Sequence, residues 1–315
     1  MTVDRVATNA QSQYLLSQIM KANTALDTTQ AQVASGKVSS DYVGIGDKTA
    51  SLEAARAVAA RADAYATNTQ LAVTQTDLQN TQLTTLSSLA EQLKQAISSA
   101  AGNSDGTGLM TTAQDIFEQA SAILNSTDAN GNYTNGGGQG NSKPFTATSL
   151  SDLTSGSVAS FFQNGSSKKS VMVGDGESVQ IGVTASDVGT QLMTALQNLA
   201  NADSPSGSLS GALTSSQTDD LTTNVLPSAT EAYSGLNDAT ATNGETYTRL
   251  QDAVTNQQSQ ATLYKGFVSN IEDADMTTAA TKLSQDQTAL QAALEVTAKL
   301  SQLSLLNYLP STTTG

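Results

Sequence analysis

Apolar residues recur at helical spacing near both ends of the chain. A helix is expected from about Asp4 to Ser35, where they stand mainly three, four or seven positions apart, at Tyr14, Leu15, Ile19, Leu26 and Val33. A second stripe of this kind predicts a final helix from about Asp273 to Tyr308. Large apolar side chains are few in both stripes, so neither helix is expected to build a large core by itself.

Two further long helices are expected between these ends. The first runs from about Lys48 to Ala101, and the second from about Asp219 to Asn270 with a break near the sequence ATNGETY. In the first, apolar residues step by three, four and four positions through Leu86, Leu89, Leu93 and Ile97. This coiled-coil-like stripe is interpreted as intramolecular core. A shorter helix is expected from Met110 to Leu124.

The middle of the chain, residues 126–212, is rich in Gly, Ser and Asn and follows a different pattern. Apolar and polar residues alternate on both sides of Gly174-Asp175-Gly176, which predicts a β-hairpin. A phosphate-binding loop is not expected there, because no Gly-Lys-Ser/Thr follows. A short helix is expected over residues 187–201 with Asp187 as its N-cap, and a linker is expected over residues 202–220.

These elements predict a mainly α fold. Both chain ends are expected to form an antiparallel bundle of long helices, and the middle is expected to be a small β-containing insertion that points outward and needs little packing. Three parts follow from this arrangement. Residues 1–45 and 271–315 form a terminal coiled coil, residues 46–125 and 213–270 form a helical bundle domain, and residues 126–212 form the variable, surface-exposed insertion.

Composition narrows the classes of function. The chain has 315 residues with 14 Lys and Arg against 28 Asp and Glu, a net charge of −14, which argues against nucleic acid or an anionic membrane as a partner. No apolar run approaches the roughly 18 residues of a membrane span, and the N-terminus lacks the pattern of a Sec-type signal peptide. Cys and His are absent, which removes thiolate sites and the commonest general base. Neither an enzyme nor a cofactor is therefore expected.

Two segments could be taken for metal sites. Glu272, Asp273 and Asp275 form the densest acidic cluster, but no His and no further carboxylate accompanies them. Asp273 is expected to cap the final helix, whose positive end favours the acids. Residues 128–139 alternate Asp and Asn as in a calcium loop, but the required Gly and the final acid are missing. No metal site is expected at either place.

The C-terminal sequence resembles the C-terminal region of bacterial flagellins and of the related hook-filament junction proteins, over about residues 235–309. The family pattern is a Gly, an Arg-Leu pair, a helix, the motif Ser-x-Ile-Glu-Asp-x-Asp and a Gln/Ala-rich helix that ends in Leu residues. The matching residues are Gly244, Arg249, Leu250, Ser269, Ile271, Glu272, Asp273, Asp275, Gln287, Gln291, Leu305 and Leu306. Residues 1–105 resemble the family through Asn9 and the sequence Ser35-Gly36-Lys37, although the paired-Asp motif that typically follows is absent.

The resemblance implies a flagellin, the structural subunit of the bacterial flagellar filament, which self-assembles through its terminal helices into a helical tube for swimming motility. It implies an extracellular location in the flagellum and export by the flagellar type III pathway without a cleaved signal. The implied partners are other copies of the chain, hook-associated and filament-cap proteins, and a flagellar export chaperone. No catalytic site and no cofactor are implied.

The apolar stripes of the terminal helices are the predicted polymerisation interface. A pair of helices offers too little surface to bury them fully, because stable bundles need three or more elements around a core. The predicted interface residues are Tyr14, Leu15, Ile19, Leu283, Leu290, Leu294, Leu300, Leu303, Leu305 and Leu306. Residues 1–45 and 271–315 are accordingly the predicted polymerisation domain.

Two alternative functions fit parts of the sequence. The ending SQLSLLNYL is more similar to hook-filament junction proteins, which share the flagellin fold and differ in copy number. The polar middle segment, with Tyr133, Phe161 and Phe162 as candidate stacking residues, would suit a secreted carbohydrate-binding or adhesive protein. An enzyme would need a carboxylate pair, and the sequence does not locate one.

The sequence leaves the role of two groups of residues undecided. Sequons in the middle segment make glycosylation an option at Asn125, Asn132 and Asn164. The few cations include Arg56, Arg61 and Arg249, which either bridge to carboxylates of neighbouring subunits or lie on a solvated face.

Overall fold

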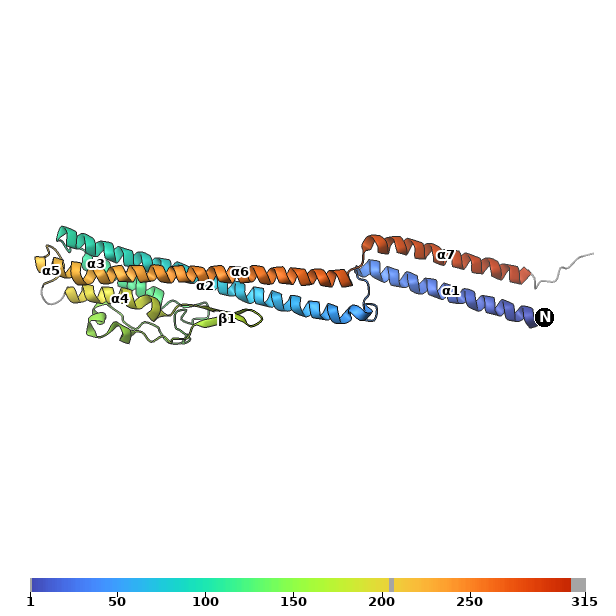
Figure 1. The fold of residues 1–315 in the computed structure, drawn as a ribbon, viewed down its shortest axis with the longest axis horizontal. Helices are drawn as coiled ribbons and strands as arrows, with labels where there is room; N and C mark the ends of the chain where they lie inside the picture. The colour runs from blue at the N-terminus through green and yellow to red at the C-terminus, as the bar shows by residue number, and fades with distance from the viewer. Residues whose placement is uncertain (1, 204–206, 307–315) are drawn as a thin grey trace, which may run out of the picture. The chain divides into compact units, whose positions relative to one another are not determined.

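The computed structural model describes residues 2–203 and 207–306, and the side chains of residues 10–203 and 207–300. The described chain is mainly helical and contains one small antiparallel sheet in its middle segment (Figure 1), so the predicted mainly α fold is confirmed. Two compact units divide the chain. One comprises Met1–Arg61 with Gln260–Gly315, and the other is Ala62–Ser259. None of the described helices combines the length and the hydropathy needed to cross a membrane.

The first unit contains the helices from both chain ends. α1 (Thr2–Ser35) and α7 (Met276–Leu306) lie side by side and antiparallel (Figure 1). The unit also contains the start of α2 (Thr49–Asn103), the end of α6 (Leu226–Glu272) and a single 3-10 turn, Gly46–Lys48. α7 begins at Met276 and not at Asp273, because the residues just before it pair with the backbone that follows α1.

In the second unit, α2 and α6 lie antiparallel and pack with the shorter helices α3 (Leu109–Leu124) and α4 (Ala185–Ala202) (Figure 1). Two side-chain hydrogen bonds join the long helices. Ser87 Oγ bonds to Asn237 Oδ1 at 2.7 Å, and Asn243 Nδ2 donates to the backbone oxygen of Thr76 at 3.0 Å. Later residues of α6 therefore pair with earlier residues of α2, as in antiparallel helices.

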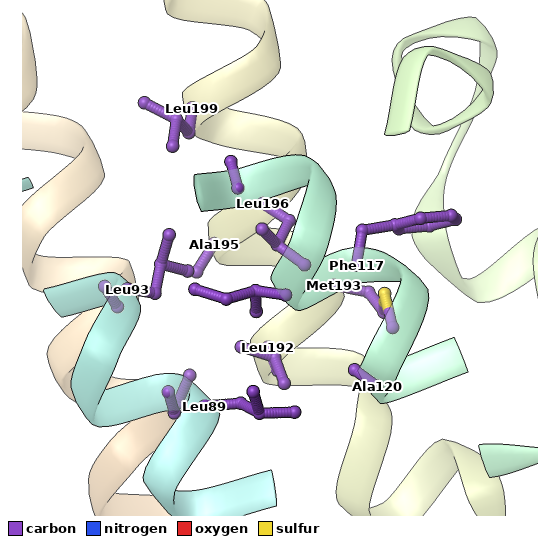
Figure 2. Packing of buried hydrophobic residues seen from close by; sticks show 14 of the residues in the cluster. Leu89, Leu93, Phe117, Ala120, Leu192, Met193, Ala195, Leu196 and Leu199 are labelled. Carbon is purple, nitrogen blue, oxygen red and sulfur yellow. The ribbon is translucent and has the colours of Figure 1, made fainter. Parts of the chain in front are cut away.

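The apolar stripe of α2 forms the centre of the main core. Figure 2 shows Leu89 and Leu93 of α2 on the side that faces Leu192 and Ala195 of α4, with Phe117 of α3 nearby. The four residues of the predicted stripe, Leu86, Leu89, Leu93 and Ile97, are at most 2% exposed. Their assignment to intramolecular core is confirmed.

The middle segment shares this core, so the expectation that it needs little packing was wrong. Its buried members include Phe145, Leu150, Leu153 and Val158. Two of these lie on the 3-10 turn Leu150–Ser155 and one on the turn Val158–Phe161. The ring of Phe145 lies 6.1 Å from that of Phe117 and 4.9 Å from that of Phe162. These apolar residues are widely and irregularly spaced in the sequence, and only the folded chain brings them together.

The predicted hairpin is confirmed. β1 (Lys169–Gly174) pairs antiparallel with β2 (Glu177–Ile181). Gly176 closes the turn with a φ of 77°, which a residue with a side chain adopts only at a cost. The inward face of the hairpin forms a small apolar cluster with α2 and α6, made of Val173, Val179, Ile181, Ala72, Val73, Leu250 and Val254.

Three local expectations were wrong. α6 continues through Gly244 without a break, because its neighbour Asn243 is anchored to α2 and fixes the helix there. Thr184, and not Asp187, is the N-cap of α4, since its hydroxyl accepts from the Asp187 backbone at 3.1 Å. The expected linker 202–220 ends in a short helix, α5 (Ser215–Asp220), and a π-helical turn, Leu221–Val225, leads on into α6.

Candidate assembly surface

α1 and α7 pack along a seam with coiled-coil spacing. On α1, the positions shielded from solvent alternate by four and three residues through Leu15, Ile19, Ala22, Leu26, Thr29 and Val33. On α7, the equivalent positions are Ala279, Leu283, Asp286, Leu290, Ala293, Thr297 and Leu300. This alternation keeps the two stripes facing each other along both helices. Apart from Thr29 and Ala279, every one of these residues is only half buried, because two helices cannot enclose a core.

A polar pair lies within the apolar seam. Thr29 is 1% exposed, and its hydroxyl donates to Asp286 Oδ2 at 2.7 Å. A polar residue at a single seam position of a coiled coil selects the register in which it finds its partner, and it does so at some cost in stability. The Thr29–Asp286 contact therefore favours one axial alignment of α1 against α7.

A groove lies on α1 outside the seam. It has a volume of about 680 Å³ and is lined by α1 residues between Gln13 and Thr28 and by Lys282 of α7. Its two large apolar side chains are Leu16 and Met20, which are 62% and 63% exposed. They stand four positions apart and so share one face of the helix. We call this the α1 groove.

The predicted interface residues divide between the seam and the solvent. Leu15, Ile19, Leu283, Leu290 and Leu300 are half buried in the seam. Tyr14 and Leu294 are 64% and 50% exposed. Leu303, Leu305 and Leu306 fall outside the described side chains. The structure contains one copy of the chain, so the role of all these residues between copies stays a prediction.

Sequence reasoning missed Leu16 and Met20. Their spacing of four residues was visible, but Leu15 and Ile19 have the same spacing one position earlier. Only the position of α7 tells which of these two stripes is covered and which faces solvent.

The end of α1 and the start of α7 are joined by their backbones. Gly36 ends α1 with a φ of 70°, the left-handed conformation that glycine adopts most readily. Val38 N donates to the oxygen of Glu272 at 2.7 Å, and Ala274 N donates to the oxygen of Gly36 at 2.8 Å. We call residues 36–38 and 272–274 the clasp.

The Glu272 carboxylate lies at the clasp between two cations. It accepts from Lys37 Nζ, and its Oε2 accepts from Arg56 Nη2 at 2.5 Å. The Glu272 side chain is 9% exposed, whereas those of Lys37 and Arg56 are 47% and 37% exposed. The hydrogen bond from Lys37 and then that from Arg56 hold the pKa of Glu272 below its ordinary value. Because Arg56 also pairs with Glu53 at 2.9 Å, it has carboxylate partners within its own chain.

Asp275, and not Asp273, caps α7. Its Oδ1 accepts from the backbone N–H groups of Thr277 at 2.9 Å and Thr278 at 3.2 Å. Hydrogen bonds from Thr278, through its hydroxyl and its N–H, and from Thr277 lower the pKa of Asp275. Asp273 instead accepts from Ser269 Oγ at 2.5 Å. The expectation for Asp273 was wrong because the clasp delays the start of α7.

The other residues of the recognised motif belong to α6. Ile271 is half buried in its last turn. Arg249 is exposed, whereas the adjacent Leu250 is fully buried against the hairpin. The motif therefore combines core positions with the capping and clasp residues that follow them.

In two of the three sequons, the asparagine side chain forms hydrogen bonds within the chain. Asn125 Nδ2 donates to the oxygen of Phe145, and its Oδ1 accepts from the N–H of Phe145, both at 2.9 Å. Asn164 is bound in the same way by Ser186, with Nδ2 donating to Oγ at 2.9 Å and Oδ1 accepting from the N–H at 3.1 Å. Asn132 has an exposed side chain. Modification at Asn125 or Asn164 would break contacts that hold the middle segment together.

The candidate stacking and calcium residues also have internal roles. Phe161 and Phe162 are half buried and pack against the main core, so their role as stacking residues for a ligand stays a prediction. Asp128 Oδ1 accepts from the N–H groups of Asn130 at 2.8 Å and Asn132 at 2.9 Å, which closes its loop on itself. Among the described residues, no three acidic side chains are grouped so that they could hold a metal ion.

Residues 226–309, which include α6 and α7, match the family described as the bacterial flagellin C-terminal helical region. The resemblance seen over about residues 235–309 is thereby confirmed. No curated protein matches the chain.

Solved structures of flagellar proteins match this chain. A flagellar hook-associated protein from Vibrio parahaemolyticus matches with a TM-score of 0.59 and 12% identity, over 74% of this chain and 99% of that chain. FlgL from Bacillus cereus matches with a TM-score of 0.42 and 15% identity, over 62% of this chain and 98% of that chain. The first of these similarities establishes a shared fold.

Proposed function

We propose that this chain, a flagellin-like protein by its C-terminal helical region, is a structural subunit of the bacterial flagellum that assembles through α1 and α7. The proposal assigns polymerisation to residues 1–45 and 271–315, a surrounding helical layer to residues 46–125 and 213–270, and an outward surface to residues 126–212. The proposed role requires neither a catalytic site nor a cofactor.

The incomplete burial of α1 and α7 is the observation that carries this proposal. Leu15, Ile19, Leu283, Leu290 and Leu300 keep part of their surface in solvent although each already faces the other helix. The α1 groove adds two more apolar side chains, Leu16 and Met20, which are largely exposed among the described residues. Further helices packed around the pair would bury this surface, and neighbouring copies of the chain supply such helices.

Repetition of one such contact gives the proposed assembly its form. A contact between two different surfaces of identical subunits generates an open helical polymer when the rotation does not close. The α1–α7 pair of one copy packed on that of the next is a contact of this kind. The proposed product is the helical tube of the flagellar filament, with a role in swimming motility.

A hook-associated role is the second candidate. The fold of this chain is similar to that of the Vibrio parahaemolyticus hook-associated protein over 74% of this chain and 99% of that chain, which supports a hook-associated role. Both roles use the same terminal helices. They differ in whether the chain extends a polymer by itself or only adds to the end of another one.

Location and partners follow from the same proposal. The subunit would lie outside the cell and reach its place through the flagellar type III export pathway. Hook-associated proteins, filament-cap proteins and an export chaperone are its proposed partners. The absence of Cys from the chain suits passage in an unfolded form, because no disulfide can form on the way.

Electron microscopy of the purified chain tests the proposal directly. The chain is concentrated alone, with short filament seeds, and with isolated hook ends. Long tubes from the chain alone or from seeds support a filament subunit, and binding confined to hook ends supports the junction role. Monomers that neither polymerise nor bind to any of these ends would refute both.

A truncation provides the matched control. Deletion of residues 295–315 removes the end of α7 and leaves Ala62–Ser259, which has its own core, untouched. We expect a folded, monomeric protein by circular dichroism and light scattering that no longer polymerises. Normal tubes from the truncated chain would contradict an interface at this end of α7.

A further inference from the structure

A cavity with a mixed polar and apolar lining lies in the second unit, and α1 and α7 contribute none of its lining residues. It has a volume of about 370 Å³, within the range of small-ligand sites. Its walls come from the glycine-rich loop of the middle segment, from residues 167–169 at the start of β1, from residues 181–184 after β2, and from Gln75 of α2. All of these lie within Ala62–Ser259.

The cavity is positively charged in a strongly acidic chain. Lys168 and Lys169 line it, and none of the described lining residues is acidic, whereas the whole chain has a net charge of −14. Lys169 Nζ lies 3.5 Å from Gln75 Oε1, which also lines the cavity, whereas Lys168 Nζ forms an ion pair with Asp187 Oδ2 at 3.2 Å. Because Asp187 balances the charge of Lys168, Lys169 is the cation that favours a ligand with an anionic group.

The glycine-rich wall leaves no room for side chains. Gly137 has a φ of 60°, and a Cβ atom there would lie 1.9 Å from the backbone oxygen of Gly165. Gly138 has a φ of 88°. The loop therefore presents peptide groups rather than side chains to the cavity, and peptide groups can bind hydroxyls as donors and as acceptors.

The remaining lining is suited to a hydroxylated ligand. It consists of Tyr133, whose ring offers an apolar face, of the apolar residues Ile181 and Val183, and of the polar side chains Gln75, Thr134, Ser167 and Thr184.

A buried glutamine lies behind one wall of the cavity. Gln79 is 2% exposed, and among the described residues neither its amide nitrogen nor its amide oxygen has a hydrogen-bond partner. The nitrogen lies 3.6 Å from the position that a Cβ atom on the wall residue Gly182 would occupy. An unpaired buried amide is costly, so Gln79 would be stabilised by a bound water, but it does not line the cavity and offers its ligand no contact.

We propose that this cavity binds a sugar acid, with its carboxylate at Lys169 and its ring against Tyr133. The hydroxyls of the sugar would bond to the glycine-loop backbone and to the polar lining. A partly exposed site of this size suits a single residue at the end of an acidic glycan. The inference does not rest on the proposed assembly, because the cavity shares no residue with α1 or α7.

The test is ligand-observed NMR titration of the full chain with galacturonate, galactose and inorganic phosphate. Galacturonate and galactose differ only in the carboxylate, and phosphate supplies charge without a ring. We expect galacturonate to bind about tenfold more tightly than galactose. Galactose binding as tightly as galacturonate, or phosphate competing as well as galacturonate, would overturn the proposal, and so would the absence of galacturonate binding.

Variants locate the site. Lys168→Gln with Lys169→Gln should weaken galacturonate binding about tenfold or more, whereas Lys168→Arg with Lys169→Arg, which keeps both charges, should retain it. Lys143→Gln with Lys265→Gln changes the net charge equally at other places and is the control. An equal loss in the control double variant would mean non-specific attraction and would refute the site. Filament or hook-end assembly of all three double variants should match that of the unsubstituted chain.

Discussion

The α1 groove gives the sharpest test of assembly, because its apolar side chains are exposed in the single chain. Complete burial of a Leu or Met side chain contributes about 1.5 to 3 kcal/mol. Leu16 and Met20 are 62% and 63% exposed, so roughly 1 to 2 kcal/mol for each is still available to a neighbour. Replacement of both by Ser should therefore weaken each contact in the polymer by about 2 to 4 kcal/mol.

That loss has a measurable consequence. A change of about 2 to 4 kcal/mol corresponds to a critical concentration for polymerisation that is about 30- to 700-fold higher. Sedimentation of polymer at a series of protein concentrations gives the critical concentration directly. The stability of the monomer should change by less than about 0.5 kcal/mol, because both side chains are surface positions outside the seam.

Polar residues of the same groove provide the control. Gln13→Ser with Thr24→Ser changes the same groove on α1 without removing a large apolar side chain. We expect its critical concentration to stay close to that of the unsubstituted chain. Suppose that the critical concentration of the Leu16→Ser and Met20→Ser double variant lay within about threefold of the original. The two side chains would then contribute less than about 1 kcal/mol to each contact between copies. The α1 groove would then not lie between copies.

Three further predictions concern stability. Glu272→Gln should lower the free energy of unfolding of the first unit by about 1 to 3 kcal/mol in thermal or urea melts, because two charged hydrogen bonds are weakened. The pKa of Glu272 in the folded chain is below its ordinary value of 4.5. The stabilisation by Glu272 should therefore be present at neutral pH and be lost as the pH falls below 4.5. Leu93→Ala should cost the second unit about 2 to 5 kcal/mol in the same melts, because the side chain is fully buried, and a loss below 1 kcal/mol would contradict the described core. Gly137→Ala should cost at least about 3 kcal/mol, whereas Gly131→Ala, with a similar φ of 81° but open space around it, should cost only about 1 kcal/mol; equal losses would mean that the close approach to Gly165 is not rigid.

Long periodic segments were predictable from the sequence because their own spacing carries the information. The stripe from Leu86 to Ile97 is one-sided, and its burial followed without knowledge of its partners. The hairpin was equally local, since alternation and a Gly-Asp-Gly turn define it. The core positions of the middle segment were not predictable, because Phe145 and Leu153 are isolated in the sequence and are buried only when α3 and α4 meet them.

In the candidate assembly surface, too, some features were predictable from local spacing and others depend on tertiary packing. Sequence spacing identified α1 and α7 as amphipathic helices with thin stripes, and the structure places most of the described residues of those stripes in the seam. Leu15 and Leu16 are adjacent apolar residues, and nothing local separates their roles. The direction from which α7 approaches decides that Leu15 faces the seam and Leu16 the α1 groove. Such a choice depends on tertiary packing, which periodicity does not contain.

The clasp explains why two motifs far apart in the sequence act together. Gly36 supplies a left-handed turn, Lys37 reaches the Glu272 carboxylate, and the two segments exchange backbone hydrogen bonds. Bringing Lys37 and Glu272 together closes a long chain loop and costs conformational entropy. The folding of the helices between these two residues offsets this entropy cost. The clasp places the end of α1 next to the start of α7, where their seam begins. The two terminal helices are therefore expected to order and to unfold as one element, so that loss of either leaves the other without the surface that holds it.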